Sequence, residues 1–211
     1  MRNDCTRSVN RFLTIAAIVV ASAAAAAAQT PPPAGAGQRG GGRGPATPPL
    51  LMTTTAWEDG GVIPDKYTMA ASSAAVSPEL KWSQVPAGTQ SFVLLMHDPE
   101  PVLNKGSKMD ITHWLIWNIP GTSTGLPEGV AAGELPDGSR QVSLRSNAYM
   151  GPGAPPGPYH HYTFELYALD TKLDVPPGTP QEAAATRTAV INTMDGHVLG
   201  KAVLVARFHR Q

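Results

Sequence analysis

Short apolar runs, separated by turn-forming residues, dominate the chain after its first quarter. Residues 91–96 (SFVLLM) and 114–119 (WLIWNI) are almost continuously hydrophobic, a pattern typical of strands that are buried on both faces. Residues 162–169 (YTFELYAL) are rich in aromatic and β-favouring residues, and 202–208 (AVLVARF) is the last such run. Proline and glycine residues between the runs favour turns. The pattern predicts a domain built mainly from short β-strands.

One helix is marked near the C-terminus. Thr179 suits an N-cap, Pro180 the first helical position, and Glu182 the third residue of a capping box. The helix is expected over 183–194, and Gly196 can supply the left-handed residue that stops it. Helices do not alternate with strands, as a doubly wound α/β sheet would need. The sequence therefore predicts a mostly β fold, a β-sandwich with a peripheral C-terminal helix.

The N-terminal quarter has a different character. Residues 1–28 read as a secretory signal peptide, because early arginines precede an apolar stretch and small residues that suit cleavage. Residues 29–49 are rich in proline and glycine and predict a disordered linker. Residues 50–211 then form one domain. This organisation predicts a periplasmic or secreted protein that does not span the membrane.

Charge and cysteine content exclude several classes of function. Cys5 is the one cysteine and lies in the predicted signal peptide, so the mature chain would have no disulfide and no thiol chemistry. The whole chain balances 16 basic against 16 acidic residues, and removing 1–28 leaves a slight acidic excess. We therefore expect no nucleic-acid partner.

Polar clusters stand at the ends of three predicted strands. Asp98 and Glu100 follow the first apolar run, and His113 precedes the second. A loop rich in proline and glycine leads into His160 and His161 at the start of the third run, where Tyr162 lies. His160 and Tyr162 are two residues apart and face the same side of a strand, whereas His161 faces the other side. The three ends could converge on one site carrying Asp98, Glu100, His113, His160 and Tyr162.

Taken together and in this order, several short segments carry a resemblance to a known family. They are 77–82 (SPELKW), 85–89 (VPAGT), 98–101 (DPEP), 113–120 (HWLIWNIP), 126–129 (LPEG), 151–152 (GP) and 160–170 (HHYTFELYALD). The chain resembles the phosphatidylethanolamine-binding protein family, in its bacterial Raf-kinase-inhibitor-like branch. The resemblance extends over nearly all of the predicted domain.

The resemblance implies a β-sandwich with a small surface pocket for anionic groups, such as the phosphate of phosphoethanolamine. Asp98 matches the first aspartate of the family's D-P-D-x-P motif, and Glu100 stands where a second aspartate is usual. The remaining matches are His113 before the second strand, Gly151 and Pro152 of the loop, and His160 and Tyr162 of the H-R-Y triplet. His161 replaces the arginine of that triplet, and the loop lacks the cysteine of the bacterial G-P-C-P-P pattern. These departures affect the shape and ligand of the pocket.

An anion site built in this way needs its histidines held in place. A carboxylate bonded to one ring nitrogen orients an imidazole and favours its charged form. We therefore expect Asp98 to orient His113 or His160, and backbone N–H groups of the Gly151 loop to supply further donors. The alternative is that these polar residues simply cap buried strand ends.

Three functions remain open on the sequence. The first is a non-enzymatic exported binding protein with a pocket for a small anion, a phosphate ester or a phospholipid head group, and with no cofactor or catalytic residue. The second is a protein-interaction module that inhibits an exported enzyme such as a protease, with an unknown protein partner. The third is a metal-dependent hydrolase that uses the same pocket, since Asp98, Glu100, His113 and His160 are ligand types for zinc or manganese.

Overall fold

The computed structural model describes residues 48–101, 105 and 110–211 of the chain. These residues fall within one compact unit, 45–211. The predicted signal peptide (1–28) and nearly all of the predicted linker (29–49) lie outside the described residues, so both stay predictions.

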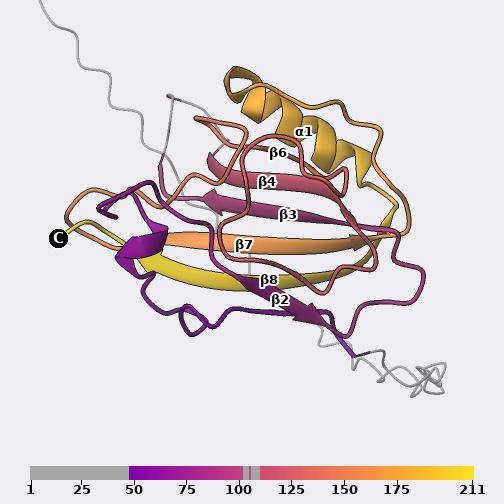
Figure 1. The fold of residues 1–211 in the computed structure, drawn as a ribbon, viewed down its shortest axis with the longest axis horizontal. Coiled ribbons are helices and arrows are strands. Elements are labelled where there is room, and N and C mark those ends of the chain that lie inside the picture. The colour runs from indigo at the N-terminus through magenta and orange to yellow at the C-terminus, as the bar shows by residue number, and fades with distance from the viewer. Residues whose placement is uncertain (1–47, 102–104, 106–109) are drawn as a thin grey trace, which may run out of the picture. The chain divides into compact units, whose positions relative to one another are not determined.

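A five-stranded antiparallel sheet is the largest element of the fold (Figure 1). Its strands, in spatial order, are β6 (Arg140–Val142), β4 (Ile111–Pro120), β3 (Ser91–Asp98), β7 (His160–Leu169) and β8 (Val198–Phe208). Because β3 runs antiparallel to both of its neighbours, the C-terminal end of β3 lies beside the N-terminal ends of β4 and β7, at the same end of the sheet.

A second, three-stranded antiparallel sheet has the order β1 (Leu51–Thr53), β2 (Leu80–Ser83) and β5 (Gly125–Leu126). A short 3₁₀ helix, η1 (Asp65–Tyr67), lies between β1 and β2 in the chain. One hydrophobic cluster joins the two sheets, because it contains Met52, Leu80 and Trp82 of the small sheet together with Phe92 and Leu94 of the large one.

The continuous hydrophobicity of β3 reflects burial on both faces of the large sheet. Phe92, Leu94 and Met96 belong to the cluster shared with the small sheet. Val93 and Leu95 belong to a second cluster, which includes residues of the helix α1 (Ala183–Thr193). Each of these five side chains is at most 1% exposed. The prediction of a strand buried on both sides is therefore confirmed.

The predicted helix is also present. It begins with a 3₁₀ turn, η2 (Pro180–Glu182), which carries the complete capping box between Thr179 and Glu182, and continues as α1. Gly196 follows with φ +80°, the left-handed conformation expected of a helix stop. Figure 1 shows α1 beside β4 and β6, and α1 contacts β4. Within the described residues, no helix combines the length and hydrophobicity needed to cross a bilayer.

The structure confirms a mostly β fold with two sheets and, among the described residues, one α-helix. The four long strands are where the apolar runs predict them, although β4 begins at Ile111, β7 at His160 and β8 at Val198, before the predicted starts. His113 therefore lies within β4 and not ahead of it. The sequence did not predict β1, β2, β5 and β6, which are only two to four residues long.

Candidate functional site

A cavity of about 280 Å³ lies where the end of β3 meets the beginnings of β4 and β7. Its polar lining consists of Asp98, His113, Arg145, His160 and Tyr162. Its apolar lining includes Met69, Pro101, Ile111, Leu144 and Met150, and the loop residues Gly153, Ala154 and Pro155 complete the wall. Four of the residues predicted from the sequence therefore share one cavity.

Strand register brings Asp98 to His160. His97 of β3 pairs with Thr163 of β7, so the next residue of β3 comes opposite the start of β7. There, His160 Nδ1 donates a hydrogen bond to Asp98 Oδ2 at 2.8 Å. The second oxygen of Asp98 accepts the backbone N–H of Glu100 at 3.1 Å. Asp98 thus fixes both the orientation of the His160 ring and the turn that follows β3.

The Asp98 carboxylate is almost completely removed from water, with 3% of its side chain exposed. Burial raises the pKa of Asp98, and the neighbouring Glu100 side chain raises it further, against the opposing effect of His160. Burial also acts to raise the pKa of Glu100, but hydrogen bonds with Asp98 and His161 outweigh it and lower that pKa. Asp98 is therefore the carboxyl of the two that takes up a proton first.

His113 has a different partner. Its Nδ1 lies 2.9 Å from the carbonyl oxygen of Met150, and its ring meets Tyr162 edge-on at 5.0 Å between centroids. Burial lowers the pKa of His113 to about 4. The ring is consequently neutral at neutral pH, with Nδ1–H donating to the carbonyl and Nε2 carrying a lone pair. Of the two histidines expected as partners of Asp98, the structure pairs His160 with it, and His113 is bonded to a backbone carbonyl instead.

Tyr162 is the most deeply buried of the polar residues that line the cavity. It is completely buried, and its hydroxyl oxygen accepts the backbone N–H of Ala154 at 3.2 Å. Burial raises the pKa of Tyr162, so the side chain stays a neutral phenol. It joins the start of β7 to the loop that closes one side of the cavity.

Gly151 and Pro152 are buried and do not line the cavity, whereas the next three residues, 153–155, form part of its wall. A Cβ on Gly151 would come within 2.8 Å of the Ala75 Cβ and 2.9 Å of the Tyr67 carbonyl oxygen. The carbonyl oxygen of Pro152 accepts the Met69 N–H at 2.8 Å. The structure thus gives the G-P pair a packing role, and its predicted ligand contact stays a prediction.

Glu100, also predicted as a site residue, is not among the residues that line the cavity, and it makes a second acid–imidazole pair. His161 Nδ1 donates to Glu100 Oε1 at 2.7 Å, and the His161 backbone N–H donates to Oε2 at 3.0 Å. Both side chains are partly exposed, at 51% for His161 and 36% for Glu100. The turn after β3 is therefore tied to the start of β7 by two adjacent pairs, Asp98–His160 and Glu100–His161.

Arg145 is a functional candidate that the sequence did not identify. It follows the short strand β6, lines the cavity, and is near enough to His113 to help lower the pKa of His113 after the larger effect of burial. In the part of the chain that the structure describes, no salt bridge joins it to an acidic residue. It belongs to none of the motifs, so no signal in the sequence marked it.

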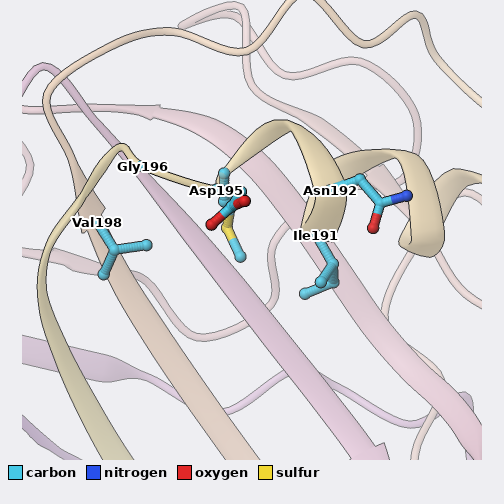
Figure 2. Close-up of a pocket in the computed structure, with 6 residues that line it drawn as sticks. Ile191, Asn192, Asp195, Gly196 and Val198 are labelled. Carbon is cyan, nitrogen blue, oxygen red and sulfur yellow. The ribbon is translucent and has the colours of Figure 1, made fainter.

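Two other regions are less suited to bind an anion. A larger cavity, about 610 Å³, lies at the C-terminal end of α1 (Figure 2). Its lining includes Ile191, Val198 and Asp195 and contains no basic residue. On the α1 side of the large sheet, His97 Nδ1 donates to Asp110 at 2.6 Å, and Arg187 of α1 pairs with the same carboxylate. This carboxylate already has two cationic or donor partners and links α1 to the sheet.

Comparison with known proteins identifies the family. A family model described as phosphatidylethanolamine-binding protein matches residues 53–209. The chain belongs to the phosphatidylethanolamine-binding protein family. The match covers nearly the whole of the described unit, so it includes every residue of the cavity lining.

Relatives of this family member occur in archaea and bacteria. A UPF0098 protein of Methanothermobacter thermautotrophicus is 44% identical over 158 residues, which are 74% of this chain and 95% of that protein. The UPF0098 protein YbhB of Escherichia coli is 32% identical over 158 residues, with 71% and 94% covered.

Solved structures give the same result. A phosphatidylethanolamine-binding protein homologue from Chlamydia trachomatis is similar with a TM-score of 0.64 and 27% identity, covering 77% of this chain and 99% of its own. Escherichia coli YbcL, described as a member of the mammalian family, is similar with a TM-score of 0.61 and 26% identity over the same shares.

Proposed function

We propose that this family member is an exported, non-enzymatic binding protein that holds a small anionic group, a phosphate ester or a phospholipid head group, in the cavity at the ends of β3, β4 and β7. The observation that carries the proposal is the Asp98–His160 pair, which lies in a cavity that also contains Arg145. Export rests on the predicted signal peptide. We interpret the two sheets as a sandwich and α1 as its peripheral helix.

The charges of the lining support an anionic ligand. Arg145 is a permanent cation, and its planar guanidinium is suited to bind phosphate through two hydrogen bonds. Asp98 engages one nitrogen of His160 and leaves the other for a ligand. Neutral His113 offers a lone pair, which can accept a hydrogen bond from a hydroxyl or ammonium group of the same ligand. The lining therefore suits an anion that also carries a donor.

Substitution of Arg145 tests the proposal. We expect Arg145→Gln to weaken binding of phosphoethanolamine about tenfold or more, since a charged hydrogen bond contributes about 1.5–3 kcal/mol. Isothermal titration calorimetry on the full-length protein measures the change. Lys172→Gln removes the same charge from an exposed residue outside the cavity lining and should leave the affinity unchanged. Equal affinities for wild type and Arg145→Gln would contradict the proposal, as would an absence of binding to any phosphate ester.

The interaction-module alternative stays a prediction. Capture of an exported enzyme by the wild-type protein, with dose-dependent inhibition of that enzyme, would favour it over ligand binding alone.

A further inference from the structure

We propose that Asp98, Glu100 and His160 form a binding site for one divalent transition-metal ion of the zinc type at the mouth of the cavity. The site is distinct from the anion contact of Arg145, and an anion could occupy an open coordination position on the metal, a detail that rests on the proposed function.

The geometry of the three side chains is the first argument. Each offers one ligand atom, and these atoms all lie within 4.8 Å of one another. Ligand atoms of a zinc ion lie about 2.0–2.2 Å from the metal and therefore about 3–4 Å apart. Small side-chain rotations would bring the three atoms to that spacing. Asp98 ends β3 and His160 begins β7, so the paired strands hold these two ligands, and hydrogen bonds to His161 hold Glu100 in the turn after β3.

The second argument is that the ligands are already oriented by outer contacts. Asp98 Oδ1 accepts the Glu100 N–H, and Glu100 accepts two N–H groups of His161. Such partners are the usual supports of metal-binding carboxylates. Each carboxylate oxygen keeps a second lone pair for a metal. His160 Nδ1 donates a hydrogen bond to Asp98 Oδ2 at 2.8 Å, and a metal ion would take the place of the proton between them.

Local charge is the third argument. Asp98 and Glu100 place two carboxyl groups with ligand atoms no more than 4.8 Å apart, and like charges this close repel one another. A divalent cation between them would offset this repulsion. It would also turn the acidic end of the cavity into a region that attracts anions. The His97–Asp110 pair differs, because Arg187 already supplies the cation there.

Three protein ligands leave one tetrahedral position open, as in zinc sites that bind water or substrate. The cavity adjoins this position, because Asp98 and His160 line it. The mixture of one imidazole and two carboxylates suits zinc or manganese better than soft-metal ions that prefer thiolates.

The test is a zinc titration of the full-length protein without a polyhistidine tag, after treatment with a chelator and without phosphate. A chromophoric zinc indicator serves as competitor. We expect one zinc ion whose affinity falls at least tenfold in both Glu100→Gln and His160→Gln. His197→Gln is the matched control, because His197 pairs with Asp170 at the same 2.8 Å on the surface and should leave zinc affinity unchanged.

Three results would overturn the site: no zinc binding above that of the indicator, equal loss in the His197→Gln control, or unchanged affinity in both site variants. Circular dichroism checks that each variant is folded. Glu100→Gln changes a partly exposed side chain, so it still tests the site if His160→Gln does not fold. Phosphoethanolamine binding measured separately in the presence of chelator distinguishes the two proposals. Zinc binding without phosphate-ester binding retains the metal site and defeats the proposed function, and the reverse result does the opposite.

Discussion

Histidines in this site differ in what their surroundings allow. His113 is 3% exposed, and this burial keeps it neutral although its hydrogen bond to the Met150 carbonyl acts in the opposite direction. His160 instead faces a carboxylate, and His161 reaches the surface. The sequence shows three histidines near strand ends but cannot rank them, because their surroundings are formed by residues distant in the chain. Burial by Tyr162 and the Met150 loop decides the protonation state of His113.

The buried His113 makes the folded state sensitive to moderately acidic pH. Burial lowers its pKa to about 4, below the ordinary value of 6.5, so the unfolded chain binds a proton that the folded chain refuses. The contribution of neutral His113 to the free energy of unfolding is fully present above the unfolded pKa. It is lost between about pH 6.5 and 4, and the loss is about 3 kcal/mol in total.

Urea unfolding of wild type and His113→Gln, at pH 7.5 and at pH 4, measures this effect. The glutamine can still donate to the Met150 carbonyl and does not titrate, so the variant should lose about 3 kcal/mol less over this interval. The same pH dependence in both proteins would show that His113 is not responsible.

Elements with a strong local signal were predictable. The long strands follow uninterrupted apolar runs, and the helix start follows from Thr179, Pro180 and Glu182. Strands β1, β5 and β6 are too short to show a period of two, and only pairing with partners far along the chain defines them. The sequence predicted the loop after Gly151 near the site. The packing of Gly151 and Pro152 depends on contacts with Tyr67 and Met69, which are distant in the chain, so the sequence could not show it.

The capping box gives a prediction for the helical element. Thr179→Ala removes the side chain that caps the first turn, and we expect the free energy of unfolding to fall by about 1 kcal/mol. Thr188→Ala makes the same change in the exposed middle of α1, where it should be neutral or slightly stabilising. Denaturant unfolding at neutral pH compares the two. A loss in Thr188→Ala that matched the loss in Thr179→Ala would argue against the cap.

At the scale of the molecule, one chain of contacts holds α1 on the large sheet. Arg187 of α1 and His97 of β3 both engage Asp110, which directly precedes β4. Despite the opposing effect of burial, the hydrogen bonds from His97 and Arg187 lower the pKa of Asp110 to about 2. Asp110 therefore stabilises the fold above its unfolded pKa of about 3.9, and this contribution is lost as the pH falls towards 2.

Replacement of Asp110 tests this contribution. Asp110→Asn should lower the free energy of unfolding by about 2 kcal/mol at pH 7, and the difference from wild type should shrink below about pH 4 and nearly vanish at pH 2. Asp174→Asn, at an exposed position, should be close to wild type throughout. Unfolding monitored by tryptophan fluorescence over this pH range gives both curves. A difference that stayed constant down to pH 2 would contradict a titrating ion pair.

The molecule as a whole shows why the family was easier to predict than the site. Short motifs along the chain mark the family, whereas Arg145 lies outside them and the choice of partner for Asp98 depends on strand register, including an irregularity between Met96 and His97. Such register shifts come from packing across the sheet and have no signature in a single strand.

The two-sided burial of β3 has a consequence for how this protein can change. Substitutions along the middle of the strand disturb one of the two cores, so they lower stability whatever they do to function. The ends of the strand tolerate substitution better, so new binding specificities should arise there while the residues of the middle stay constant.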